Sequence, residues 1–292
     1  MQIISGQSNP QLAKMVAKEI GAPILTTKVD NFNDGELRIQ VMDRISKDVV
    51  IIQSTSYPAN NHLMELLLLA DTAKRAGAQN ITALIPYFGY SRQDRCTYKF
   101  GPVSAALVIK LLEASGITRV ITLDLHSPQL EGVFNIPVIN LDPASLFFPE
   151  VQNDDDIIVV SPDIGGIARA RSFSSLLGKD IAIINKSRDH NNECHMSSVI
   201  GQVKNKKCVI IDDIIDSAGT LCKAAELLLQ NGALEVICFA SHAVFSGGAA
   251  VKIEKSETKK VYVSDSICHH QLPDKVKVLS AAKLLAAGLK EE

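Results

Sequence analysis

Two adjacent carboxylates followed by a hydroxyl- and glycine-bearing loop form the part of the sequence best suited to chemistry. Asp212 and Asp213 come directly after 209–211, an apolar run with the brevity and β-branching of a buried parallel strand. A helix is predicted from about residue 221 to residue 230. A strand that leads through such a loop to a helix N-terminus presents backbone N–H groups to a phosphate. The acids in front suit hydrogen bonds from sugar hydroxyls, or a hydrated Mg²⁺ ion.

A phosphate at one end and a diol at the other describe a ribose phosphate. No lysine follows the glycine, so the loop is not of the Walker A type. An alternative is that Ser217 or Thr220 only caps the helix and that the acids are solvated. A third acid and the S-x-G-T pattern weaken this alternative. The candidate ribose-phosphate residues are Asp212, Asp213, Asp216, Ser217, Ala218, Gly219 and Thr220.

Length and composition predict a folded protein that is not built for nucleic acid. The 292 residues favour two domains of ordinary size, and 46% apolar against 21% charged residues is ample for a packed core. A net charge of −2 without a basic run argues against nucleic acid as the main partner. No apolar stretch reaches membrane-spanning length, so we expect a soluble, cytoplasmic protein without a membrane partner.

Cysteine usage also predicts a reducing compartment. The chain contains six cysteines and no CxxC pair, and their spacing does not match a metal site. Several lie in apolar runs, so buried thiols are expected.

Strands alternate with helices along the chain, which predicts an α/β protein with mostly parallel sheets covered by helices on both faces. The pattern restarts after about residue 145, and we expect two similar domains, 1–145 and 146–280, with a helix at about 280–290 completing the first. The βαβ unit that starts at 50–53 parallels the one that starts at 209–212, a weak sign of duplication. The predicted strands are 2–5, 26–29, 37–41, 49–53, 81–85, 120–123, 157–161, 181–185, 199–203, 209–211, 235–240 and 260–263, and the main helices are 10–20, 62–76, 102–115, 166–177, 221–230, 251–255 and 281–290.

Two further polar stretches come just beyond predicted strands, where an α/β fold binds ligands. Asp124 and His126, two residues apart, could bind a metal or a phosphate, although a structural histidine is the commoner case. Asp163 is followed by Gly165 and Gly166, which let a backbone approach a ligand closely. The alternative for Asp163 is an ordinary helix N-cap.

Two cationic stretches complete the candidates. Arg92 and Arg95 follow an aromatic segment and could clamp a polyphosphate or stack on a base, or form a solvated charge run. Lys186 and Arg188 begin a polar tract, 187–194, that we expect to be an exposed, mobile loop. They are either surface cations or the charge supply of a loop that closes over substrate.

Taken together, these stretches resemble the ribose-phosphate pyrophosphokinase family, whose motifs they follow in order over nearly the whole chain. D-D-x-x-D-S-x-G-T at 212–220 resembles the family's ribose 5-phosphate loop, and N-F-N-D-G-E at 31–36 with R-Q-D at 92–94 resembles its ATP site. D-L-H at 124–126 and P-D-x-G-G at 162–166 resemble its pyrophosphate and Mg²⁺ segments. The resemblance implies two type I phosphoribosyltransferase-like domains.

The resemblance also implies the reaction and the roles of the residues. The β,γ-diphosphoryl group of ATP is transferred to the 1-hydroxyl of ribose 5-phosphate, giving phosphoribosyl diphosphate (PRPP) and AMP. Mg²⁺ is the implied cofactor, and a dimer-based homo-oligomer, up to a hexamer, is the implied assembly. Lys186 and Arg188 are the implied catalytic cations. The implied ATP residues are Phe32, Asp34, Glu36, Arg92, Gln93 and Asp94, and the implied metal ligands are His126, Asp163 and Asp124.

The chain departs from the family pattern in three places. The segment 95–101, R-C-T-Y-K-F-G, replaces a more basic stretch that helps to form the regulatory site, which puts phosphate activation and ADP inhibition in doubt. Ile164 stands where a smaller residue is usual, and the C-terminus is short.

Two rival functions can be weighed on the same residues. A transferase that consumes PRPP would explain the loop at 212–220 and leave 92–94 and 124–126 unexplained. A catalytically silent regulatory subunit would be expected to lose Lys186, Arg188, His126 or Asp163, and all four are present.

Overall fold

The computed structural model describes the backbone of residues 1–188 and 194–290, and the side chains of this part except at 186–197. The chain forms two compact units. The first comprises Met1–Asp142, Ser266–Cys268 and Ser280–Glu292, and the second comprises Pro143–Asp265 and His269–Leu279. The chain passes from the first unit to the second after Asp142, near the expected boundary at 145.

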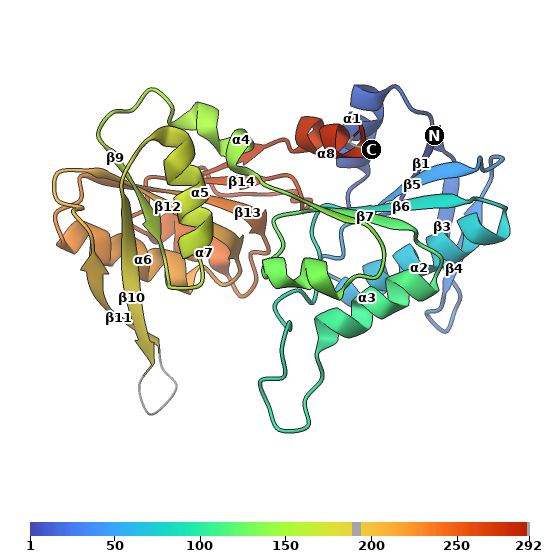
Figure 1. The fold of residues 1–292 in the computed structure, drawn as a ribbon, viewed down its shortest axis with the longest axis horizontal. Helices are drawn as coiled ribbons and strands as arrows, with labels where there is room; N and C mark the ends of the chain where they lie inside the picture. The colour runs from blue at the N-terminus through green and yellow to red at the C-terminus, as the bar shows by residue number, and fades with distance from the viewer. Residues whose placement is uncertain (189–193, 291–292) are drawn as a thin grey trace. The chain divides into compact units, whose positions relative to one another are not determined.

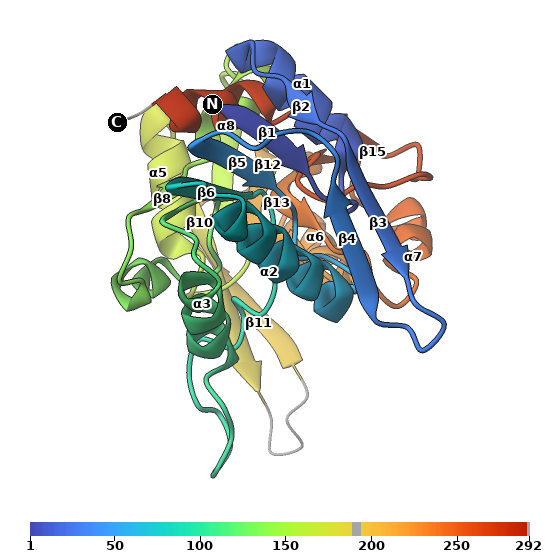
Figure 2. The ribbon, with the colours of Figure 1, turned by 90° about the vertical axis from the view of Figure 1, so that its right-hand side faces the viewer.

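The first unit is built on a parallel sheet of six strands in the order β2-β1-β5-β6-β7-β8 (Figure 1). Its central strands are apolar on both faces, as expected for strands covered on both sides by helices. A separate antiparallel hairpin, β3 paired with β4, lies beside α2 (Figure 2). The strands are β1 Gln2–Ser5, β2 Ile24–Leu25, β3 Thr27–Asn31, β4 Leu37–Val41, β5 Asp48–Ile52, β6 Asn80–Ile85, β7 Arg119–Leu123 and β8 Val138–Leu141.

Helices cover both faces of this sheet. α2 and α3 pack their apolar sides on one face, whereas α8, from the C-terminal end, packs on β7, β8 and α1. Gly288 of α8 lies so close to Leu141 that a Cβ atom there would stand 3.1 Å from the leucine side chain. The helices are α1 Pro10–Ile20, α2 Ala59–Arg75, α3 Ser104–Ala114, the 3₁₀ helix η1 Pro128–Val133, and α8 Ala282–Lys290.

The second unit has a sheet of seven strands in the order β11-β10-β9-β12-β13-β14-β15, in the described part of the chain. All neighbours are parallel except the hairpin of β10 and β11. The strands are β9 Ile157–Ser161, β10 Ile181–Arg188, β11 Cys194–Ile200, β12 Lys207–Ile215, β13 Glu235–Ala243, β14 Lys260–Ser264 and β15 Val276–Leu279.

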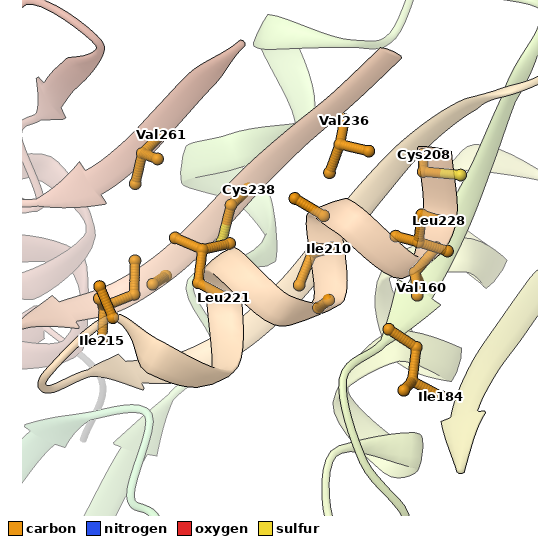
Figure 3. Close-up of a cluster of buried hydrophobic side chains, with 14 of the residues drawn as sticks. Val160, Ile184, Cys208, Ile210, Ile215, Leu221, Leu228, Val236, Cys238 and Val261 are labelled. Atoms are coloured by element: carbon orange, nitrogen blue, oxygen red, sulfur yellow. The ribbon is translucent and has the colours of Figure 1, made fainter. Parts of the chain in front are cut away.

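Two apolar clusters fix the helices of the second unit to the sheet. On one face, Leu221 and Leu228 of α6 pack against Ile210, Val236 and neighbouring side chains (Figure 3). On the other face, Phe173 of α5 packs against Phe239, with ring centroids 5.7 Å apart. The helices are α4 Ala144–Phe147, the 3₁₀ helix η2 Phe148–Glu150, α5 Ile167–Leu177, α6 Gly219–Gln230 and α7 Ala249–Lys255.

The predicted α/β class with mostly parallel sheets is confirmed, and the two predicted βαβ units, β5-α2-β6 and β12-α6-β13, are both present. The strand predicted at 199–203 is wrong, because β11 runs from Cys194 to Ile200. Both ends of the predicted 187–194 loop lie in strands that pair with each other: Arg188 in β10 lies opposite Cys194 in β11. The short strands β2, β8 and β15 escaped prediction because edge strands of two to four residues carry little periodicity.

None of the helices within the described residues is long and apolar enough to cross a membrane.

Candidate active site

The ribose-phosphate loop joins β12 to α6 at the carboxyl end of a parallel strand. β12 continues to Ile215, so Asp212 and Asp213 lie inside the strand, one residue before its last pairings with β13, and not beyond it as predicted. α6 begins at Gly219, two residues earlier than predicted. Ala218 takes a left-handed conformation, with φ 60°. Among the described residues no side chain caps the start of α6, and the first amide groups of a helix lack partners within the helix, which suits a phosphate cradle.

The two adjacent acids, Asp212 and Asp213, differ in their electrostatic surroundings. Asp213 is buried and pairs with Arg169 of α5, with 3.7 Å between Oδ1 and Nη1. Asp212 keeps part of its surface exposed, but its carboxyl group is enclosed by protein. Burial raises the pKa of Asp212 well above its usual range, Asp213 and Asp163 raise it further, and Arg169 opposes the shift. A cationic or hydroxyl-rich ligand would relieve this crowding of negative charge.

The other polar groups of the loop are held by a neighbouring segment that sequence reasoning missed. Ser246 donates a hydrogen bond to Oδ1 of Asp216, and Lys252 Nζ donates to the carbonyl of Ser217 at 3.1 Å. Both residues follow β13, where Gly247 and Gly248 have positive φ. A polar, glycine-bearing loop just beyond a strand was the signal that could have found them.

The P-D-I-G-G segment joins β9 to α5. Asp163 Oδ1 accepts a hydrogen bond from the N–H of Gly166 at 3.0 Å, and Ser161 Oγ donates to the Asp163 carbonyl at 2.6 Å. The carboxylate therefore supports the turn before α5, but the N-cap of this helix is Gly166, so the alternative of Asp163 as an N-cap is wrong. Its charge nevertheless acts on Asp212, so the structure brings the two predicted residues into one electrostatic group. Ile164 beside it is 67% exposed.

Lys186 and Arg188 lie at the end of β10, with their backbones opposite Met196 and Cys194 of β11. The side chains of both residues lie outside the described residues, as does the segment 189–193. Their role therefore remains a prediction.

The D-L-H segment follows β7 in the first unit. Asp124 has φ 43°, and its N–H donates to the carbonyl of Leu141 at 3.0 Å. The N–H of Leu125 donates to Oδ1 of Asn140 at 2.9 Å, which fixes the turn. The side chain of Asp124 is partly exposed and that of His126 is exposed.

The first group of predicted ATP residues lies at the tip of the β3-β4 hairpin. Phe32 is 49% exposed, and the guanidinium of Arg38 lies 5.4 Å from the centre of its ring. The turn is closed by backbone hydrogen bonds, and the N–H of Glu36 donates to Oδ1 of Asp34 at 3.1 Å. An exposed aromatic ring beside a cation can stack on a base.

The second group of predicted ATP residues lies in the loop between β6 and α3. Gln93 is anchored to the helix, because Ser104 Oγ donates to its Oε1 at 2.6 Å. Arg92 is exposed and Asp94 partly exposed. The altered segment that follows is also exposed, with Cys96 Sγ donating to the carbonyl of Tyr98 at 2.9 Å. Cys96 thus departs from the expectation of buried thiols, whereas Cys208 and Cys238 are buried.

The metal candidates were tested against the chemistry of their donors. No group of three or more His, Cys, Asp or Glu side chains is gathered within the described residues. Mg²⁺ does not need such a cage, since it keeps several waters and takes one or two carboxylates together with substrate phosphates. The carboxylates of Asp124 and Asp163 fit this pattern. The imidazole of His126 fits it less well, because Mg²⁺ prefers oxygen ligands.

Comparison with known proteins gives matches over both units. Residues 1–116 match the family model for the N-terminal domain of ribose phosphate pyrophosphokinase, and residues 144–274 match that for the phosphoribosyl transferase domain. A ribose-phosphate pyrophosphokinase from Helicobacter hepaticus is 46% identical over 98% of this chain and 93% of its own. The enzyme from Agrobacterium fabrum is 43% identical over 99% of this chain and 96% of its own.

A solved structure agrees with these matches. The crystal structure of phosphoribosylpyrophosphate synthetase from Mycobacterium smegmatis superposes with a TM-score of 0.92. It is 33% identical in sequence and covers 99% of this chain and 97% of its own.

Proposed function

Because the chain belongs to the ribose-phosphate pyrophosphokinase family, we propose that it transfers the β,γ-diphosphoryl group of ATP to the 1-hydroxyl of ribose 5-phosphate. The products are PRPP and AMP, which places the enzyme in nucleotide biosynthesis. The observation that carries the proposal is the cradle between β12 and α6, with two acids in the strand before it. This arrangement offers a phosphate site and a diol site on one short segment.

In this proposal the second unit binds ribose 5-phosphate. The 5-phosphate lies on the N–H groups at the start of α6, with Ser217, Gly219 and Thr220 around it. The carboxyl group of Asp212 accepts hydrogen bonds from the ribose hydroxyls. Asp216, which accepts a hydrogen bond from Ser246, keeps the loop in shape. The remaining candidate, Ala218, contributes its left-handed backbone.

The first unit supplies the nucleotide residues in this proposal. Phe32 stacks on the adenine, and Arg92 contacts the polyphosphate or the base. Gln93, tied to Ser104, holds the loop that carries Arg92. Asp34 and Glu36 form the hairpin turn that presents Phe32.

Catalysis of this transfer depends on position and charge. The attack of the 1-hydroxyl on the β-phosphorus develops negative charge on the phosphate oxygens, and cations that meet this charge lower the barrier. Lys186 and Arg188 are proposed as these cations. Mg²⁺ bound to phosphate oxygens would neutralise part of the same charge. Its proposed ligands are Asp163 in the second unit, and Asp124 and His126 in the first.

A cytoplasmic homo-oligomer is the proposed working form, and apolar exposure in the first unit supports an assembly. Leu107 and Leu111 lie four residues apart on one face of α3 and are 56% and 40% exposed.

The reaction can be tested by mixing the purified protein with ATP, Mg²⁺ and ribose 5-phosphate and following the products by phosphorus NMR. We expect AMP together with a diphosphate ester on C1. ATP left intact while the protein still binds it would instead establish a silent regulatory subunit. ADP as the product would mean an ordinary phosphokinase and overturn the proposal.

A further inference from the structure

Arg169, which was not among the candidate residues, occupies a special place beside the ribose-phosphate acids. It lies on α5, in the helix that follows Asp163, and its guanidinium pairs with Asp213 of β12 at 3.7 Å. The two side chains are only 17% and 7% exposed. The pair is therefore shielded from solvent, unlike ion pairs at the surface, which contribute little.

The two acids lie side by side near the end of β12, and Arg169 meets one of them directly. Asp213 faces α5, because its carboxylate pairs with Arg169 of that helix. Asp212 lies next to it, and its Oδ1 accepts a hydrogen bond from the N–H of Asp213 at 3.0 Å. The charge of Arg169 acts on Asp212 as well.

The charges of this region need a counter-charge. The carboxyl groups of Asp213 and Asp163 both act on that of Asp212, and Arg169 is the cation that acts on Asp212 among the described residues. Two adjacent acids in a buried strand repel each other unless one of them is neutralised. Arg169 meets this requirement through Asp213, since its planar guanidinium can hold a carboxylate in a fixed position.

We infer that Arg169 is a positioning residue for ribose 5-phosphate: it holds Asp213 against α5 and thereby fixes the neighbouring carboxyl group of Asp212 for the sugar hydroxyls. The inference rests on the proposed function for the identity of the sugar. It assigns different roles to the two acids that the sequence treats alike. Asp212 contacts the ligand, and Asp213 with Arg169 forms the support that fixes it.

Arg169→Met tests the inference, with Arg171→Met as the matched control, because Arg171 is an exposed arginine on the same helix. Steady-state kinetics should show the KM for ribose 5-phosphate raised about tenfold or more in Arg169→Met, a usual effect of losing a supporting partner. The KM for ATP should stay within about twofold in both variants, and Arg171→Met should match the wild type. Arg169→Lys should recover only part of the affinity, because lysine is a point charge.

Calorimetric titration of ribose 5-phosphate into the same proteins separates this inference from the proposed function. If the wild type binds the sugar and makes no AMP, the function fails, while a weaker affinity in Arg169→Met still supports the inference. If the variant binds the sugar as tightly as the wild type, or if the KM values for both substrates rise equally, Arg169 has no positioning role. A wild type that does not bind ribose 5-phosphate also overturns the inference.

A variant that fails to fold would be replaced by Arg169→Met combined with Asp213→Asn, which removes the buried charge that Arg169 balances. The double variant should regain thermal stability and keep the raised KM for ribose 5-phosphate. A normal KM in this folded protein would overturn the inference.

Discussion

The two βαβ units that resemble each other in sequence differ in the surroundings of the polar residue at the end of their first strand. In the first unit, Gln53 follows β5 and donates to the buried Glu65 of α2 at 2.7 Å, while its Oε1 accepts from the N–H of Ser8 at 3.0 Å. In the second unit, the equivalent Asp212 lies before an open cradle, and Glu226, the equivalent of Glu65, is exposed.

This difference shows that the same βαβ unit can use its polar residues either to stabilise the fold or to bind a ligand. The polar side chains after β5 satisfy one another, so this edge is closed and contributes to folding. The acids at the end of β12 crowd negative charge around Asp212, as expected of the ligand site that we propose there. Substitutions at equivalent positions should therefore act on stability in one unit and on substrate affinity in the other.

The largest effect is expected from Asp212→Asn. Each hydrogen bond to a charged group contributes about 1.5–3 kcal/mol, so kcat/KM for ribose 5-phosphate should fall by about 10- to 100-fold. The same variant should be more stable than the wild type at neutral pH. Glu226→Gln serves as the control on the same unit.

The sign of the stability change follows from the raised pKa of Asp212. The folded state binds its proton more tightly than the unfolded state, so its contribution to stability is complete below the unfolded-state pKa and is lost as pH rises through the folded-state pKa. Thermal melts of both proteins from about pH 3, below the ordinary Asp pKa of about 3.9, to about pH 8 should show the stability gain of the variant growing with pH. If the wild type instead gains stability relative to the variant as the pH rises, the pKa of Asp212 is not raised in the folded protein.

Next in size is the contrast between Glu65→Leu and Glu226→Leu. Removing Glu65 takes away one acceptor of the buried Gln53 amide, at about 1–3 kcal/mol, and the acceptor of the partly buried N–H of Gln7. The exposed Glu226 should change the free energy of unfolding by less than about 0.5 kcal/mol. Urea denaturation of the two variants measures both values. Equal destabilisation would remove the distinction between a closed and an open edge.

A smaller effect is expected from Phe32→Ala. Stacking of a base on an aromatic ring contributes about 1–3 kcal/mol, so the KM for ATP should rise by about tenfold. The KM for ribose 5-phosphate should not change, because the second unit binds that substrate in our proposal. Phe32→Tyr keeps the ring and should behave like the wild type. If the KM for ribose 5-phosphate rises instead, Phe32 does not bind ATP as proposed.

The smallest functional effect concerns the cysteines. Burial raises the pKa of Cys208 to about 12 and that of Cys238 well above its ordinary value, so neither thiol should react in the folded protein. Cys96 is exposed and should be labelled by a thiol reagent before Cys208 and Cys238, without loss of activity. Mass spectrometry of the labelled protein, with Cys96→Ser as the control, measures the order. Early labelling of Cys208 would show that β12 becomes exposed to solvent in the folded protein.

Strand periodicity and helix-end signals allowed most of the fold to be predicted. Ile157–Ser161 and Leu37–Val41 were predicted with their final bounds, because apolar or alternating runs report burial directly. Pro10 at the start and Gly21 at the end bracket α1 as the sequence indicated. Strand ends were harder to predict where polar residues lie inside a strand. Asp212 and Asp213 look like a loop in sequence because charge usually marks a strand end, and here neighbouring groups allow them inside β12.

By itself, the sequence determined the α/β class, the order of the ligand loops and the chemistry of the ribose-phosphate segment, since each depends on residues close together in the chain. Only the tertiary structure decided which acid of the pair meets the guanidinium of Arg169. Arg169 and Ser246 reach that segment from other elements, and their side chains determine its charge and its shape. Contacts between residues 30 or more positions apart depend on how the helices and strands pack, and no local pattern in the sequence specifies them.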